Sequence, residues 1–451
     1  MKLQRGIVKR KGLKMLKRQS FFWGTAILFL AIVIGCGEAP PPEPPTAEKI
    51  SKVDTLFGHI LADNYSWLRD RDNPDVIAYL EAENAYTEAV MKDASDLRDK
   101  LFQELKSRIV EEDKSVPARD GDYYYYYRNE GGKQYNIYCR KKGSLEAPEE
   151  VLLDCNKLAE GMDYFNLGSY AVSTNGNILA YAIDTSGGER YRIKFKDIKT
   201  GEILPDEISG ASTSIAWAND NKTLFYMTRD ETWRPNRLYR HNLGSDQAGD
   251  KLIYEEEDGR FWSGIYKSKS DKYLTLYIGS KITTEFRILD ADNPTGEFKI
   301  FNPRNTGVEY SIAHHDDMFY ILTNADGATN FKLMSTPVSR TEKRNWKEVI
   351  PTSDSVMIDN MEVFKNYLVL FIRDQGQTMI RVTDLRDNTT HMVNFDESVY
   401  TVENGTNLEY DNDILRFNFT SMLTPQSVYD YNMNDRTMEL KKQKEVPGYD
   451  R

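Results

Sequence analysis

Serine and histidine are the side chains of this sequence that could support acyl transfer, in which a histidine base activates a serine hydroxyl. The 451 residues contain five histidines, His59, His241, His314, His315 and His391. In α/β-hydrolases the catalytic serine lies in a Gly-x-Ser-x-Gly turn between a strand and a helix, beside the donors that stabilise the oxyanion. No Gly-x-Ser-x-Gly occurs in the sequence. We therefore predict no catalytic serine here and assign no catalytic residue.

Paired carboxylates are a second source of chemistry, because two acids about 5–10 Å apart can hydrolyse a glycosidic bond. The acids that would have to be paired are spread along the chain, at Asp120, Glu309, Glu362 and Glu409. The sequence cannot show which of them meet. A glycosidase therefore stays an open alternative that the structure can test.

A metal site is suggested by the run His314-His315-Asp316-Asp317. In a strand, however, adjacent side chains point to opposite faces, so the two histidines would not converge on one ion. Two acids directly after a strand are also the ordinary composition of a hairpin turn. We therefore predict neither a metal site nor a cofactor.

The first 35 residues have the pattern of a lipoprotein signal peptide. A basic segment without acids precedes an apolar run, 21–35, which is short for a membrane span. The run ends in Val33-Ile34-Gly35-Cys36, which resembles the lipobox of bacterial lipoproteins, and residues 36–50 form a proline-rich tether. We expect Cys36 to be lipidated and the protein to be exported, anchored to the bacterial cell envelope and facing the periplasm or the exterior. A single-pass anchor with an unmodified Cys36 is the alternative.

Metabolic labelling with a fatty-acid probe in a bacterial host tests this expectation. The wild-type chain should take up the label and Cys36→Ala should not, because the thiol of Cys36 is the atom to which the lipid is attached. Equal labelling of both chains would contradict lipidation at this position.

The charge of the chain is strongly acidic once the leader is set aside. Removing the eight basic residues of the leader from the total of 59 leaves 51 against 70 acidic residues, a net charge of −19. Such a surface repels the phosphate backbone, so nucleic acid is excluded as a partner. It favours cationic ligands, although solubility alone also explains it.

Polar turns followed by β-rich runs recur along the chain at intervals of 45 to 55 residues. One unit, 212–255, contains four such runs. A four-stranded sheet repeated at this interval is typical of a β-propeller, whereas a β-sandwich lacks the fixed period. We predict an all-β, seven-bladed propeller of four-stranded antiparallel blades over 114–443. The second strands are expected to begin at Tyr123, Ile178, Thr223, Tyr273, Met318, Tyr367 and Ile414.

Aromatic and sulfur side chains in the first repeat are predicted to be structural. Tyr123–Tyr127 would place alternate rings against the two neighbouring sheets, and a peptide contact is the alternative. Cys139 and Cys155 are expected to be buried free thiols, with a disulfide as the alternative in an exported protein.

Residues 51–113 form a short segment of a different kind. After Asp72-Asn73-Pro74, a helix-start signal, apolar side chains recur at helical spacing up to Met91. A second helical pattern runs from Leu97 to Ile109. We expect residues 54–113 to be helical.

Several stretches resemble the prolyl oligopeptidase family of serine peptidases. The N-terminal pattern lies in 63–70 and 76–86, and later stretches narrow the resemblance to the oligopeptidase B (protease II) branch. The similar segments share order and spacing: 132–135, 163–165, 217–237, 309–311, 421–425 and 445–448.

The resemblance implies a serine endopeptidase that cleaves short peptides after arginine or lysine. In that family an α/β-hydrolase domain follows a segment like 445–448, so we expect residues 444–451 to be a truncated linker and this chain alone to be inactive. The implied partners are short, possibly basic peptides, the missing hydrolase domain if it is encoded separately, and the membrane through Cys36. A lipid-anchored propeller that binds a peptide or protein without catalysis is the alternative.

Overall fold

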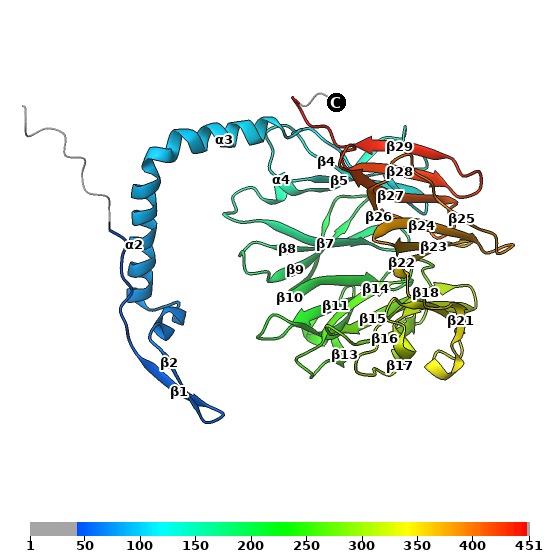
Figure 1. Cartoon of the computed structure of the whole chain (residues 1–451), viewed down its shortest axis with the longest axis horizontal. Coiled ribbons are helices and arrows are strands. Elements are labelled where there is room, and N and C mark those ends of the chain that lie inside the picture. The colour runs from blue at the N-terminus through cyan, green and yellow to red at the C-terminus, as the bar shows by residue number, and fades with distance from the viewer. Residues whose placement is uncertain (1–42, 449–451) are drawn as a thin grey trace, which may run out of the picture. The chain divides into compact units, whose positions relative to one another are not determined.

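The computed structural model describes residues 43–448, which fall into two compact units divided between Arg108 and Ile109. The first unit contains a two-stranded ribbon and a pair of helices (Figure 1). Its elements are β1 (Lys52–Leu56), β2 (His59–Asp63), η1 (Ser66–Arg69), α2 (Pro74–Met91), η2 (Lys92–Ala94) and α3 (Ser95–Ser107).

The helix-start signal after Asp72 is confirmed by α2. Asn73 caps the helix by accepting a hydrogen bond from the amide of Asp75 at 2.9 Å, and Pro74 occupies the first turn. The prediction that residues 54–113 are helical is wrong at both ends, because 54–63 lie in β1, β2 and the turn between them, and α3 ends at Ser107. Phe57 and Gly58 adopt φ angles of 48° and 78°, which fits a tight hairpin turn between these strands.

The first unit has almost no core of its own. Val76 is the one buried side chain among its described residues. Leu97, Leu101 and Leu105 follow one face of α3 with 59%, 48% and 64% of their surface exposed. Apolar stripes of this kind are typical of surfaces that another protein part covers.

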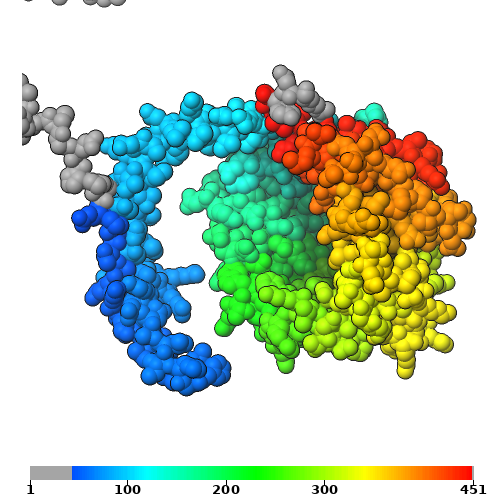
Figure 2. Space-filling model, in the orientation of Figure 1, coloured from blue at the N-terminus to red at the C-terminus, as the bar shows by residue number. Residues whose placement is uncertain are grey.

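The second unit is built from antiparallel sheets (Figure 1). They surround a hollow, which the space-filling view shows (Figure 2). Five sheets have four strands each: β3 (Ala118–Asp120) to β6 (Glu149–Asp154), β14 (Trp262–Lys267) to β17 (Lys299–Asn302), β18 (Tyr310–His315) to β21 (Lys347–Ile350), β22 (Val356–Val363) to β25 (Thr390–Met392), and β26 (Tyr400–Asn404) to β29 (Met438–Gln443). Their middle strands are β4 (Tyr123–Arg128), β5 (Ile137–Lys142), β15 (Tyr273–Gly279), β16 (Thr284–Asp290), β19 (Met318–Thr323), β20 (Lys332–Pro337), β23 (Tyr367–Asp374), β24 (Gln377–Asp384), β27 (Ile414–Ser421) and β28 (Ser427–Asn432).

A sixth sheet contains seven strands in sequential order. They are β7 (Asn166–Val172), β8 (Ile178–Asp184), β9 (Tyr191–Asp197), β10 (Ile203–Trp217), β11 (Thr223–Arg229), β12 (Pro235–Asn242) and β13 (Lys251–Glu255). Short helical turns α4 (Cys155–Leu158), η3 (Gln247–Gly249), η4 (Ala325–Gly327) and η5 (Lys343–Asn345) connect strands of this unit.

The prediction of seven separate four-stranded blades is therefore wrong, although all seven expected second strands begin at the predicted residues. The described residues form five four-stranded blades and one seven-stranded sheet. The physical reason is β10, which carries its hydrogen bonds from β9 to β11 without a break in the strand. Gly210 has a φ of 70°, and the register shifts on both sides of Ala211, so the chain changes neighbours while it stays extended.

Buried apolar side chains fill the space between neighbouring sheets. Phe371 and Val382 of one blade pack with Phe417 and Tyr431 of the next. Similar clusters join each sheet to its successor along the chain. Burial of large rings on both faces of these sheets is what stabilises the ring of sheets.

The junction between the last and first sheets is different, because polar contacts hold the two sheets together. Lys442 pairs with Asp113 at 2.6 Å, and Arg416 donates to the carbonyl of Pro117 at 2.8 Å. Figure 1 shows β27 and β28 beside β4 and β5 at this junction. Within residues 43–448, no buried apolar cluster bridges it.

Both cysteines of the first blade are buried and free, as predicted. Burial raises the pKa of the Cys139 and Cys155 thiols to about 12, so neither is ionised near neutrality. Cys36 and the expected signal peptide lie outside the described residues. No helix within 43–448 has the length and apolar character that crossing a membrane requires.

Candidate functional site

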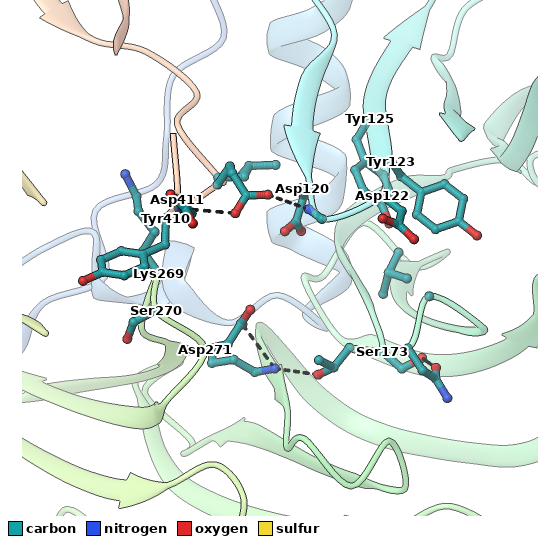
Figure 3. A pocket seen from close by; sticks show the side chains of 18 residues that line it. Asp120, Asp122, Tyr123, Tyr125, Ser173, Lys269, Ser270, Asp271, Tyr410 and Asp411 are labelled. Carbon is teal, nitrogen blue, oxygen red and sulfur yellow. Dashed lines mark hydrogen bonds and ion pairs between the residues drawn. The ribbon is translucent and has the colours of Figure 1, made fainter. Parts of the chain in front are cut away.

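A cavity of about 490 Å³ opens at one end of the hollow in the second unit (Figure 3). It is lined by the turns that follow the inner strands β3, β7 and β14 and by the loop between β26 and β27. In each blade the first strand ends at this edge. The chain enters β3 and leaves β29 at the opposite edge, because strands alternate in direction. The cavity therefore lies on the face away from these two connections.

The turns are held in place by hydrogen bonds between different sheets. The amide of Gly121, where φ is 56°, donates to Glu409 at 2.9 Å and so joins the first sheet to the last. Arg140 donates to the carbonyl of Gly176 at 2.7 Å, and its guanidinium lies 3.8 Å from the centre of the Tyr123 ring. The cavity wall is therefore fixed by contacts that link several sheets.

The lining carries more negative than positive charge. Five acids face two lysines, namely Asp120, Asp122, Asp271, Glu409 and Asp411 against Lys267 and Lys269. Desolvation raises the pKa of Asp120, and repulsion from Asp271 and Glu409 raises it further. Desolvation likewise raises the pKa of Asp271, although Lys267 at 3.5 Å opposes the effect. Asp120, Asp271 and Glu409 therefore repel one another across the opening.

Lys269 lies deeper in the wall than the acids. Its ammonium pairs with Glu362 and lies 4.0 Å from the centre of the Phe364 ring. Burial lowers the pKa of Lys269, while the charge of Glu362 opposes that shift. Glu362 also accepts a hydrogen bond from Asn404 at 2.5 Å, so these three residues connect the turn after β14 with the inner strands β22 and β26.

The repulsion across the cavity predicts that Asp120→Asn stabilises the protein at neutral pH. For a carboxyl whose folded pKa is raised, ionisation costs stability above the folded pKa, and this cost disappears as the pH falls to the unfolded pKa. The expected gain is a few tenths of a kcal/mol, because the side chain is open to solvent and screened. Thermal melting at pH 7 and near pH 4, at low and high salt, measures it. Asp122→Asn is the matched control, and an equal gain there would indicate a general effect of charge.

The structure brings together only some of the carboxylates considered from the sequence. Asp120 and Glu409 both line the cavity, and Glu362 reaches its wall through Lys269. Glu309 does not line it and accepts a hydrogen bond from Asn324 at the far end of β18. The amide contact of Glu409 and the ion pair of Glu362 give these carboxylates structural roles.

The histidines are dispersed, and four of them have a hydrogen-bond partner. His59 is exposed in β2, whereas the other four lie in the second unit. The partners are Asp250 for His241, Ser270 for His314, the carbonyl of Lys365 for His315, and Tyr431 for His391. Nowhere in the described chain are three His, Cys, Asp or Glu side chains placed to hold one metal ion.

The pair Ser270 and His314 was missed from the sequence. Ser270 Oγ lies 2.7 Å from His314 Nδ1, and Ser270 lines the cavity. Burial lowers the pKa of His314, so the imidazole is neutral at physiological pH. The only signal available was positional, since both residues lie near the same edge of consecutive repeats. Ser270 lies in a turn between two strands and not in the strand-to-helix elbow of a hydrolase.

The tyrosine run is divided between core and cavity. Tyr126 is buried and donates to Glu149 at 2.6 Å, whereas Tyr127 is 41% exposed. Tyr123 and Tyr125 both line the cavity. Core packing therefore describes only part of the run, and two of the rings are placed where a ligand in the cavity would touch them.

Comparison with known proteins identifies relatives of nearly the whole chain. The family model described as "Prolyl oligopeptidase, N-terminal beta-propeller domain" matches residues 44–444. Dipeptidyl aminopeptidase BI of Pseudoxanthomonas mexicana is 38% identical over 453 residues, 96% of this chain and 62% of the relative. Protease 2 of Moraxella lacunata is 34% identical over 415 residues, 90% of this chain and 59% of the relative.

Solved structures show the same relationship. Oligopeptidase B from Leishmania major superposes with a TM-score of 0.83 at 31% identity, covering 90% of this chain and 61% of that protein. Oligopeptidase B from Trypanosoma brucei, in a closed form with covalently bound antipain, superposes with a TM-score of 0.84 at 30% identity and with the same coverage. The chain thus spans about three fifths of the length of these relatives.

Proposed function

The chain belongs to the prolyl oligopeptidase family, and we propose that it serves as the propeller part of an oligopeptidase-B-like serine peptidase. In this proposal the propeller controls which peptides reach a catalytic α/β-hydrolase part, and cleavage follows arginine or lysine. The observation that carries the proposal is the match of residues 44–444 to the propeller domain of this family. The relatives extend over further residues, in which the catalytic groups would lie.

The cavity supports the substrate class. Five acids against two lysines at the opening attract cationic peptides and repel acidic ones, and such a field raises the local concentration of a basic substrate. Tyr123 and Tyr125 add aromatic surface for the peptide chain. Short basic peptides are therefore the proposed ligands. The proposed location is separate from this argument: it is the cell envelope, to which lipid on Cys36 would anchor the chain.

Activity measured in trans tests the proposal. The purified chain is mixed with the part of a relative that lies beyond the region matched here, and hydrolysis of arginyl and lysyl peptides is followed. Activity that appears only with both parts supports a peptidase assembled around this propeller. Binding of basic peptides without any activity in the mixture would favour the non-catalytic binding module instead.

The exposed face of α3 predicts where the two parts meet. Burying a leucine side chain contributes about 1.5–3 kcal/mol, so Leu101→Glu should weaken assembly in trans by at least about tenfold. Gln103→Glu adds the same charge on the same helix but off the apolar stripe, and should leave assembly unchanged. Titration of activity with the catalytic part gives the apparent affinity of each variant.

Limited proteolysis of the same proteins gives an independent readout. In the chain alone, cleavage within residues 43–108 should precede cleavage of the sheets, because these helices bury almost nothing. The catalytic part should protect the wild type and Gln103→Glu but not Leu101→Glu. Equal resistance of the helices and the sheets in the chain alone would show that α3 is already covered.

A further inference from the structure

Two loops of the seven-stranded sheet bring Arg190 and an exposed tryptophan together, beside Arg229 at the end of β11. The loops connect β8 to β9 and β11 to β12, at the edge where the chain enters β3 and leaves β29. Trp233 is 40% exposed. The guanidinium carbons of Arg190 and Arg229 lie 5.3 Å and 5.8 Å from the centre of its ring, within the range of cation–π interaction.

The backbone of both loops is held in an unfavourable conformation by a buried network. Glu189 and Trp233 have φ angles of 51° and 67°, which residues with a side chain rarely adopt. Asp184 accepts hydrogen bonds from the amides of Ser186 at 2.8 Å and Glu189 at 2.7 Å. Conformations of this cost persist where neighbouring contacts fix them, often at binding sites.

The second loop is fixed in the same way by Asp230. Burial alone would raise the pKa of Asp230, but hydrogen bonds from Thr232 and Arg234 lower it to about 2. The amide of Trp233 also donates to the carbonyl of Asp230 at 3.1 Å. These hydrogen bonds fix the backbone that carries Trp233 beside the guanidinium of Arg190.

Arg190 differs from the other arginines that stack on aromatic rings. Seven arginines of the described chain do so, and six of them also pair with a carboxylate. The six pairs are Arg140 with Glu150, Arg229 with Glu189, Arg260 with Asp258, Arg287 with Glu285, Arg304 with Glu256, and Arg386 with Asp384. Within residues 43–448, Arg190 has its ring contact and no carboxylate partner.

The charges around Arg190 leave it free to take an anion. The one acid next to it in sequence, Glu189, is bound to Arg229 at 2.6 Å. Arg229 is held by this carboxylate and by the Trp233 ring, so among the described residues of the cluster Arg190 is the exposed cation without a carboxylate partner. The whole chain is acidic and repels anions at long range, so any affinity for one must come from these local contacts.

We propose that Arg190, supported by Trp233 and Arg229, binds a carboxylate of a peptide. A planar guanidinium forms two parallel hydrogen bonds with a carboxylate, and the indole keeps the guanidinium in one orientation. The inference rests on the proposed function in taking a peptide as the ligand. It adds an anchor for a peptide carboxylate at the edge of the sheets opposite to the acidic cavity, which attracts cationic groups.

Calorimetric titration of the purified chain at low salt with matched peptides tests the site. The probes are acetyl-tetra-alanine with a free carboxylate, its carboxamide, and acetyl-Ala-Ala-Glu-Ala carboxamide. The free carboxylate should bind about tenfold more tightly than the carboxamide, as expected for one charge-assisted pair. Tight binding of the glutamyl probe would identify a side-chain carboxylate as the ligand. Tight binding of acetyl-tetra-alanine with a free carboxylate would identify a chain terminus as the ligand.

Arginine variants decide whether Arg190 is responsible. Arg190→Gln should abolish the preference for a carboxylate without changing the melting temperature, because this side chain is exposed. Arg190→Lys should keep only part of the preference, since it retains the charge and loses the paired hydrogen bonds. Arg260→Gln is the matched control, because Arg260 is also exposed and stacked on a ring but already bound to Asp258 at 2.6 Å.

The proposal is overturned if the acid and the carboxamide bind equally, if neither binds at millimolar concentration, or if Arg190→Gln retains the preference. These measurements need no hydrolysis. If activity appears in trans but the chain shows no preference for a carboxylate, this site is contradicted and the proposed function stands. If the chain prefers the carboxylate but no activity appears in trans, the site stands and the proposed function is contradicted.

Discussion

These 451 residues alone are expected to hydrolyse no ester or amide of arginine or lysine above the uncatalysed rate. A serine–histidine–aspartate triad contributes roughly 10⁶-fold, and this requires a nucleophile, its base and an oxyanion site in one place. The sequence has no Gly-x-Ser-x-Gly, and the peptide-orienting effect of a propeller cannot replace the triad. Initial rates with arginyl and lysyl substrates, with and without the catalytic part of a relative, give the measurement.

Ser270 provides the strictest test of this prediction, because its hydroxyl lies beside a histidine. Ser270 Oγ lies 2.7 Å from His314 Nδ1 at the cavity, so it is the residue to watch for an unexpected nucleophile. It lies in a turn between β14 and β15, and a hydroxyl with a base but no elbow lacks the amide donors that stabilise the oxyanion. A serine-directed fluorophosphonate should therefore leave the chain unlabelled. Stoichiometric labelling that Ser270→Ala removes would show that this pair is catalytic.

The family and the strand pattern could be predicted from the sequence because both depend on local residues. Polar turns before β-rich runs locate Thr223 and Ile414 as strand starts, and Asn73-Pro74 locates the start of α2. The joined sheet could not be predicted in this way. Whether residues 208–213 form a loop or stay extended depends on hydrogen bonds to two other strands, β9 and β11. The residue types of 208–213 do not indicate these hydrogen bonds.

The candidate sites could likewise be predicted only in part from the sequence. The acids of the cavity were visible in the sequence, but their convergence depends on turns from four sheets meeting at one edge. Arg190 has no distinguishing neighbour in sequence. Its unpaired state appears only when Glu189 is seen to bind Arg229. Closure of a ring of sheets places residues more than 200 positions apart side by side, as with Gly121 and Glu409, and composition cannot report such pairs.

Phe417→Ala is expected to give the largest loss of stability among single substitutions considered for this chain. Phe417 is fully buried, its ring lies 5.6 Å from those of Phe395 and Tyr429, and it belongs to the cluster that joins the last two blades. Truncation of a buried phenylalanine costs about 3–5 kcal/mol, through lost contacts and the cavity left behind. That is a large part of the 5–15 kcal/mol typical of a folded domain. Denaturant titration measures the loss as a shift in the midpoint.

The position of Phe417 predicts how this loss is distributed. One side of the last blade is held by the Phe417 cluster, while its other side meets the first blade through polar contacts such as Lys442 with Asp113. Weakening the apolar side should therefore release β26–β29 before the other sheets, seen as faster hydrogen exchange confined to residues 400–443. Phe57→Ala is the control: Phe57 is 92% exposed, so its truncation should change stability by less than about 0.5 kcal/mol. Uniform acceleration of exchange across all sheets in Phe417→Ala would show instead that the ring opens as one cooperative unit.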